Sequence, residues 1–150
     1  MSDFREVTAD FWASPQITAA DVAEAARRGC TMIINNRPEG ESDDQASGIE
    51  IEQAARALGL GYVAIPVTHA GFSRPQIDSM IKALEQGSDQ GTGPVLAYCR
   101  SGTRSTLLWA LAQAQLGRNP GEIANAAAGA GYDVGPIAPL MDMLAASQPD

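Results

Sequence analysis

The chain contains few of the residues that form covalent or metal cross-links. Its 150 residues include two cysteines, at positions 30 and 99, and a single histidine. Two cysteines are too few for a disulfide framework, and a chain of this length can bury a core without one. We therefore expect a reduced compartment, the cytoplasm. No metal and no other cofactor is expected, since neither a metal-ligand cluster nor a nucleotide fingerprint is present.

Long apolar runs and positive charge are also scarce. No run of about 18 apolar residues occurs, so no membrane span is predicted. Residues 1–13 carry acidic groups and lack a basic region followed by an apolar core, so no signal peptide is predicted. The formal net charge of −8 argues against nucleic acid as a partner, because phosphate backbones need a basic surface. A small anionic substrate remains compatible with this charge because its binding is decided locally. No oligomeric state is predicted.

Apolar spacing predicts strands that alternate with helices. Thr31–Asn35, Gly61–Val67 and Val95–Tyr98 are apolar runs of strand length, and a period near 3.6 residues marks the helices between them. Thr18 and Asp21 have the spacing of a helix-capping pair. One or two edge strands are expected within residues 4–13. The predicted helices cover residues 19–28, 49–58, 73–84, 105–116, 122–128 and 136–146, and a polar linker is predicted at residues 87–93.

Strands that alternate with helices favour parallel pairing with right-handed crossovers. We predict one α/β domain over residues 1–150, with a mostly parallel central sheet flanked by helices in three layers. Sites in such sheets form beyond the carboxyl ends of the strands. Cys99 directly follows the strand Val95–Tyr98 and lies at that edge. Cys30 precedes the strand Thr31–Asn35 and lies at the opposite edge, which favours structural packing over a role as resolving partner for Cys99.

Cys99 opens a polar loop that leads into the helix starting near Ser105. Backbone amides and a helix N-terminus favour an anion there, and Arg100 and Arg104 add full charges. We expect these surroundings to hold Cys99 as a thiolate, so that one loop offers both a nucleophile and an oxyanion cradle. The alternative, a small buried hydrophobic cysteine, leaves the arginines and hydroxyls around it unexplained. The interpretation requires a thiol that solvent can reach.

Three residues of this loop have specific expected roles. Arg104 is expected to bind a tetrahedral or sulfonate-like group with two hydrogen bonds, because a cation at a helix N-terminus is otherwise unfavourable. Gly102 is expected in a conformation closed to other residues, so that successive amides converge. Ser105 either bonds to the thiolate or caps the helix. The other predicted members of the anion-binding loop are Arg100, Ser101 and Thr103.

The motif CRSGTRS at residues 99–105 carries a family resemblance. Its Cys-x4-Arg spacing resembles the active-site loop of rhodanese-type sulfurtransferases. It also resembles, one residue short, the Cys-x5-Arg loop of protein tyrosine and dual-specificity phosphatases. INNRPEGE (34–41), YVAIPV (62–67) and AGYD (130–133) extend the likeness to roughly residues 11–144. Together the four motifs resemble the phosphatase-like domain, also described as a sulfur transferase, at the N-terminus of beta-lactamase-hydrolase-like proteins.

That resemblance implies a dual-specificity-phosphatase-like fold. Because relatives are fused to a metallo-hydrolase-like domain, it also implies a functional link to a persulfide-oxidising enzyme of that kind. Tyrosine phosphatases carry an aspartate general acid in the loop where this chain has His69, and residues 69–75 contain no acid. Without an acid the ester-cleaving step loses about 10²–10⁴ in rate. His69 is a candidate replacement, whereas Asp78 lies too far along the next helix.

Further residues follow the strand Thr31–Asn35 at the same edge of the sheet. Asn36 and Arg37 are accessory candidates there. Arg37 is either a second anion contact or gate, or an ordinary surface arginine. The acidic stretch from Glu39 to Asp44 is predicted to be a solvated loop.

The leading hypothesis is a sulfurtransferase. Cys99 would take sulfur from thiosulfate or a small persulfide, held by Arg104 and Arg100, and pass it to a thiophilic acceptor. The four-residue spacing and the missing acid both favour this reaction over ester hydrolysis. The alternative is a cysteine-dependent phosphatase of the tyrosine or dual-specificity type, and a third hypothesis is a non-catalytic anion-binding module.

Overall fold

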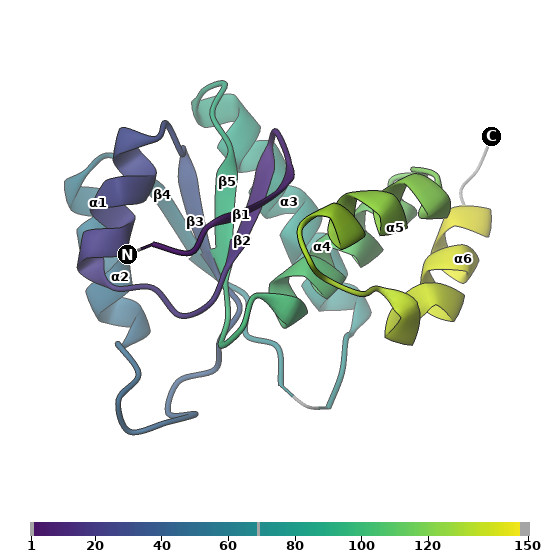
Figure 1. The fold of residues 1–150 in the computed structure, drawn as a ribbon, viewed down its shortest axis with the longest axis horizontal. Helices are drawn as coiled ribbons and strands as arrows, with labels where there is room; N and C mark the ends of the chain where they lie inside the picture. The colour runs from purple at the N-terminus through teal and green to yellow at the C-terminus, as the bar shows by residue number, and fades with distance from the viewer. Residues whose placement is uncertain (1, 69, 148–150) are drawn as a thin grey trace.

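The computed structural model describes residues 2–68 and 70–147, which form a sheet of five strands flanked by helices on both faces (Figure 1). The strand order is β1-β2-β5-β3-β4, and only β1 and β2 pair antiparallel. The predicted three-layer, mostly parallel α/β fold is confirmed. The strands are β1 (Arg5–Thr8), β2 (Phe11–Ser14), β3 (Met32–Asn35), β4 (Gly61–Ala64) and β5 (Val95–Tyr98).

The central strands bury both faces, which explains their continuous apolar sequence. Ile33 of β3 packs in the core beneath α1 (Ala19–Arg27) and α2 (Gly48–Ala57). Its neighbour Ile34 packs in the core on the opposite face, because successive side chains of a strand point to opposite sides. That second face is covered by α3 (Arg74–Gln90) and α4 (Thr103–Gln115). Helix α5 (Pro120–Gly129) packs against α4 and β1, and α6 (Ala138–Ala146), preceded by the short 3₁₀ helix η1 (Gly135–Ile137), packs against α4 and α5 farther from the sheet.

Helix α4, which follows the predicted active-site loop, is buried along most of its length. It contacts α3, α5 and α6 as well as the sheet, and its residues from Ser105 to Ala112 are all buried. The sequence predicted an amphipathic helix opening near Ser105. The helix instead begins at Thr103, and it is apolar on nearly every side because other elements surround it.

Helix ends follow the predicted caps in some places and differ in others. Thr18 and Asp21 form the expected reciprocal capping pair at α1. Helix α3 runs on to Gln90, through most of the stretch predicted as a linker. Gly87 is buried within it, and a Cβ there would lie 2.4 Å from Cγ2 of Val95. This glycine therefore permits a close approach of helix to strand instead of marking a loop.

Strand β4 ends at Ala64, before the predicted end at Val67. The backbone nevertheless continues alongside the chain that follows β3. The amide of Ile65 donates to the carbonyl of Asn35 at 2.8 Å, and the amide of Val67 donates to that of Asn36 at 3.0 Å. These bonds carry Val67 to the carboxyl edge of the sheet. Across the described residues, no helix is both long enough and apolar enough to cross a membrane.

Candidate active site

Loops that follow the parallel strands converge at the carboxyl edge of the sheet. The amide of Asn36, after β3, donates to the carbonyl of Tyr98 at the end of β5 at 2.8 Å. The amide of Gln16, after β2, donates to the carbonyl of Arg100 at 3.4 Å. The edge expected from the strand order is therefore where Cys99 and its neighbours gather, while Cys30 lies before β3 at the other end.

Gly102 turns the loop back onto the sulfur. Its amide donates to Sγ of Cys99 at 3.1 Å, and its φ of 92° lies in the left-handed region that glycine tolerates best. A Cβ at this position would lie 2.2 Å from Oη of Tyr132. Both the backbone angle and the close approach therefore require glycine. Gly102 is also the N-cap of α4, so the positive end of that helix lies beside the sulfur.

Cys99 itself is completely buried, with 0% of its surface exposed. The expectation of a thiol that solvent can reach is therefore wrong for this conformation. The Gly102 amide folds back on the sulfur, and the guanidinium of Arg104 lies close enough for the charge of Cys99 to contribute to its raised pKa. A substrate must consequently open this arrangement to reach the sulfur.

Arg104 is held by a carboxylate and a carbonyl. Its Nη1 donates to Oε2 of Glu41 at 2.7 Å and to the carbonyl of Val67 at 2.6 Å, and its Nη2 donates to Oε1 of Glu41 at 2.8 Å. These two-point bonds to Glu41 are the main cause of the raised pKa of Arg104. In return, the hydrogen bonds from Arg104, helped by those from Arg37, lower the pKa of Glu41 to about 2. Glu41 is thus ionised at neutral pH.

Arg37 is a buried brace behind this pair. Its side chain is 4% exposed, so it is not an ordinary surface arginine. Nε donates to Oε1 of Glu41 at 3.0 Å, Nη1 to Oε1 of Gln16 at 3.0 Å and Nη2 to Oγ of Ser42 at 3.2 Å. Each of its three nitrogens therefore already has an acceptor. Arg37 thus holds the acidic stretch in place.

The acidic stretch is therefore only partly the solvated loop that the sequence predicted. Asp43 and Asp44 are exposed, but Glu41 turns inward to the two arginines. The signal that could have found Glu41 is its place in the motif INNRPEGE, four residues after Arg37 and just beyond β3. An acid in that position can reach any cation at the same edge of the sheet.

The remaining loop residues have more varied surroundings. Ser105 does not cap α4, because the cap is Gly102, and its buried Oγ has no hydrogen-bond partner among the described residues. Ser101 Oγ donates to Oγ1 of Thr103 at 2.9 Å and accepts from its amide at 3.3 Å. Arg100 is exposed. The hydrogen bond from Ser42 is the main cause of the lowered pKa of Asp44, and the positive charge of Arg100 makes a smaller contribution to it.

Two accessory candidates complete the predicted set. Asn36 is fully buried, and its Nδ2 donates to the carbonyl of Ile65 at 2.9 Å, so this amide mainly ties together the ends of β3 and β4. His69 lies outside the described residues. Within those residues, no group of three or more His, Cys, Asp or Glu side chains could hold a metal ion.

Tyr132 contacts the loop, although no local pattern in the sequence indicates this contact. Its Oη donates to the carbonyl of Ser101 at 3.2 Å, and the guanidinium of Arg5 lies 5.4 Å from the centre of its ring. Burial raises the pKa of this phenol. Tyr132 belongs to the motif AGYD, which supported the family resemblance without indicating a contact. The residue therefore supports the loop from the segment between α5 and η1, about 30 residues further along the chain.

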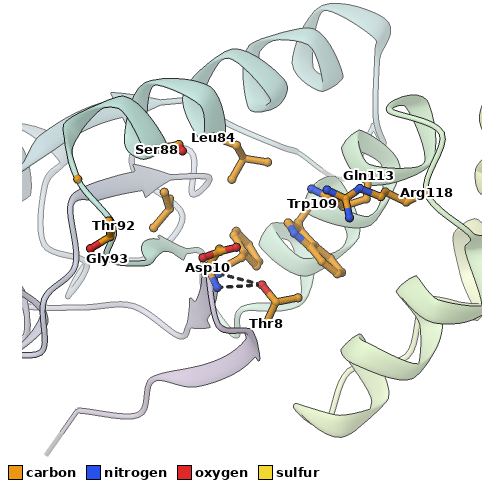
Figure 2. A pocket seen from close by; sticks show the side chains of 12 residues that line it. Thr8, Asp10, Leu84, Ser88, Thr92, Gly93, Trp109, Gln113 and Arg118 are labelled. Carbon is orange, nitrogen blue, oxygen red and sulfur yellow. Dashed lines mark hydrogen bonds between the residues drawn. The ribbon is translucent and has the colours of Figure 1, made fainter.

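A separate pocket of about 570 Å³ lies at the other edge of the sheet (Figure 2). Val95, the first residue of β5, lines it, together with Asp10, Trp109 and Arg118. Cys99 follows the last residue of the same strand. The pocket is therefore distinct from the cysteine site.

Comparison with known proteins agrees with this geometry. A family profile described as "Beta-lactamase hydrolase-like protein, phosphatase-like domain" matches residues 3–116. A beta-lactamase hydrolase-like protein of Agrobacterium fabrum is 38% identical over 100 residues, which are 66% of this chain and 22% of that protein. The matched part thus spans under a quarter of the length of this curated relative.

Solved structures show the same fold. The crystal structure of a candidate phosphatase from Neisseria meningitidis Z2491 is 32% identical, with a TM-score of 0.76 over 93% of this chain and 96% of that one. Tk-PTP in its active form is 16% identical, with a TM-score of 0.71 over 97% of both chains, and shows likeness of fold alone. Fold and loop together define a phosphatase-like α/β domain. The chain belongs to the phosphatase-like domain family of beta-lactamase hydrolase-like proteins.

Proposed function

We propose that this domain is a cysteine-dependent phosphatase with Cys99 as its nucleophile. The observation that carries the proposal is the hydrogen bond of 3.1 Å from the Gly102 amide to Sγ, at the start of a helix whose second residue is Arg104. The sequence alone ranked sulfur transfer first. Membership of a phosphatase-like family reverses that order, since its solved relatives share the tyrosine-phosphatase fold.

The proposed reaction has two displacement steps. The Cys99 thiolate attacks the phosphorus of a phosphate monoester, an S–P bond forms, and the P–O bond to the leaving group breaks. Water then attacks the cysteinyl phosphate, the S–P bond breaks, inorganic phosphate leaves, and a proton passes to solvent as the thiolate returns. Loop amides and Arg104 stabilise the charge on the three oxygens that do not react.

The leaving oxygen needs a proton in the first step, and Glu41 cannot supply it. Its pKa of about 2 leaves it ionised at neutral pH. We therefore expect activity on esters whose leaving group is a stable anion, such as aryl phosphates, for which protonation matters least. His69 remains the candidate acid for less activated esters.

Sulfur transfer is the second candidate, and the four residues between Cys99 and Arg104 favour it. The thiolate would attack the outer sulfur of thiosulfate, forming an S–S bond while sulfite leaves with the electron pair of the broken one. An acceptor thiolate would then take that sulfur and regenerate Cys99. No proton is needed by the leaving group. A persulfide-oxidising metallo-hydrolase-like enzyme is the partner we propose for this reaction.

One experiment separates these possibilities. The protein is incubated with an aryl phosphate and, separately, with thiosulfate, while phosphate release and intact protein mass are measured. Phosphate release that disappears in Cys99→Ser and persists in Cys30→Ser supports the phosphatase. A sulfur atom gained by Cys99 without phosphate release overturns it in favour of sulfur transfer. If neither occurs, the result supports the third hypothesis, a non-catalytic anion-binding module.

A further inference from the structure

The peptide that joins Ser101 to Gly102 makes two hydrogen bonds in opposite directions. Its N–H, which belongs to Gly102, donates to Sγ of Cys99 at 3.1 Å. Its carbonyl, which belongs to Ser101, accepts from Oη of Tyr132 at 3.2 Å. A trans peptide is planar, with its N–H and its C=O on opposite edges. The sulfur and the phenol therefore hold one rigid unit from its two sides, and turning that unit over would break both bonds together.

This peptide needs an outside restraint because of the residue that follows it. Glycine tolerates positive and negative φ about equally, so the backbone of Gly102 does not by itself fix the peptide before it. The peptide after Gly102 is fixed by α4, since its carbonyl accepts from the amide of Thr106 at 3.0 Å and from Oγ1 of the same residue at 2.9 Å. Among the described residues, no donor other than Tyr132 reaches the Ser101 carbonyl. The orientation of the peptide thus depends on Tyr132 as well as on the sulfur.

Tyr132 is itself held in place. Its amide donates to the carbonyl of Ala127 at 2.9 Å, which ties it to the last turn of α5. Its side chain is buried, and the guanidinium of Arg5 lies over its ring. A phenol fixed in this way has little conformational freedom left to lose when it bonds to the loop.

We propose that Tyr132 is a positioning residue that keeps the peptide between Ser101 and Gly102 turned with its N–H towards the sulfur of Cys99. This inference rests on the proposed function, in which Cys99 reacts as a thiolate. With the peptide turned over, the carbonyl oxygen of Ser101 would face the sulfur and repel its negative charge. The phenol therefore favours the orientation in which the nucleophile is ionised.

Other groups that act on the sulfur stay the same when this phenol is changed. The hydrogen bonds to Glu41 are the main cause of the raised pKa of Arg104, and a hydrogen bond to Cys99 is a smaller one. The N-terminus of α4 lies beside the sulfur, and Arg100 follows the cysteine in the loop. Burial is the main cause of the raised pKa of Tyr132, and the negative charge of Cys99 adds to it. The phenol and the sulfur are thus close enough to act on each other.

The pH dependence of Cys99 labelling tests this role. Iodoacetamide reacts with the thiolate, and peptide mass spectrometry follows the rate at Cys99 between about pH 4 and pH 9. Tyr132→Phe keeps the ring and removes the hydroxyl. In this variant the pH of half-maximal labelling should rise by about one unit, because the charged sulfur loses a well-oriented hydrogen bond. The rate at high pH should be no lower than in the wild type, since a more basic thiolate is more nucleophilic.

A merely structural role would lower the rate without moving this midpoint. An unchanged or lowered midpoint in Tyr132→Phe therefore overturns the proposal.

Tyr62→Phe is the matched control. Tyr62 is a half-buried phenol whose Oη accepts from Nδ2 of Asn35 at 3.0 Å, so this variant also removes one hydroxyl and one hydrogen bond. It should leave the midpoint of Cys99 labelling unchanged. An equal rise in the two variants would reveal a general loosening of the fold and refute a specific role for Tyr132.

A reciprocal measurement covers the case in which Tyr132→Phe does not fold. If the phenol and the sulfur act on each other, their coupling must be the same in both directions. Removing the thiolate with Cys99→Ser should therefore lower the pKa of Tyr132, measured by NMR of the labelled ring, whereas Cys30→Ser should not. An unchanged pKa of Tyr132 in Cys99→Ser counts against the proposal.

Neither measurement requires turnover, so the two proposals can fail separately. A chain that releases no phosphate would refute the proposed function and still show whether Tyr132 sets the state of the sulfur. A midpoint that stays fixed in a chain that does release phosphate would refute the role of Tyr132 and leave the phosphatase standing.

Discussion

The two cysteines of this chain are both buried, yet their surroundings differ in kind. Cys30 lies before β3 in a core with Val22, Ala25 and Ile33, and burial raises the pKa of its thiol to about 12. Cys99 lies after β5 with a backbone amide on its sulfur and a guanidinium beside it. Burial alone therefore does not distinguish a reactive cysteine from an inert one. The polar groups that accompany the sulfur make the difference.

Replacing the two thiols should give the largest contrast. Cys99→Ser should lower phosphate release by about 10⁴-fold or more, because loss of the nucleophile removes the covalent step. Cys30→Ser should keep turnover and lose on the order of 1 kcal/mol of unfolding free energy, since it places a hydroxyl in an apolar core. Steady-state kinetics and urea unfolding of both variants measure this. Comparable activity in the two variants would remove the distinction between the cysteines.

The glycines next to the cysteines offer a second contrast. Gly102→Ala combines a φ of 92° with a Cβ only 2.2 Å from Oη of Tyr132, so we expect a displaced loop and about 10²-fold lower turnover. Gly29→Ala has a similar φ of 94° with nothing within 4 Å of the added Cβ. It should cost about 1 kcal/mol of stability and leave kcat intact. Kinetics and thermal unfolding of both variants provide the measurement.

A double variant separates the two causes at Gly102. Gly102→Ala with Tyr132→Phe removes the hydroxyl that the new Cβ would strike, and it should recover part of the lost turnover. If the double variant is no better than the single one, backbone strain alone explains the loss.

Alkylation should distinguish the same two thiols without a substitution in the chain. With a pKa of about 12, Cys30 is ionised to about one part in ten thousand at pH 8, so it should resist iodoacetamide. Cys99 should be labelled at least about tenfold faster than Cys30, as the side chains that cover it move. Sulfate should slow the labelling of Cys99 and leave that of Cys30 unchanged. Peptide mass spectrometry over a time course gives both rates. Equal rates, or sulfate protection of both cysteines, would contradict the comparison.

Acid should weaken the edge of the sheet that holds Cys99. Because the pKa of Glu41 lies at about 2 in the folded chain and near 4.5 otherwise, its ionised form stabilises the fold. That contribution is complete above pH 4.5 and is lost as the pH falls through about 2. The wild type should therefore lose on the order of 1 kcal/mol more than Glu41→Gln between pH 5 and pH 2.5, by urea unfolding. Parallel losses in the two proteins would show that Glu41 contributes nothing.

Local patterns were sufficient to predict the elements and the edge of the site. The apolar strands, the Thr18–Asp21 cap and the placement of Cys99 after β5 follow from spacing and strand order. The inward turn of Glu41 was missed because it depends on Arg104, 63 residues away. Gly87 was misread as part of a linker for the same reason, since only its contact with Val95 shows why a glycine lies within a helix.

The contact of Tyr132 with the loop has a consequence for how this family can vary. The matched family region ends at residue 116, whereas the phenol that closes against Gly102 and Ser101 comes from beyond it. The loop around the nucleophile therefore takes one of its contacts from a segment outside the matched region, so the two can be varied separately in an experiment. Chimaeras that graft residues 117–147 from a homologue would alter the outer wall of the loop without changing a letter of CRSGTRS.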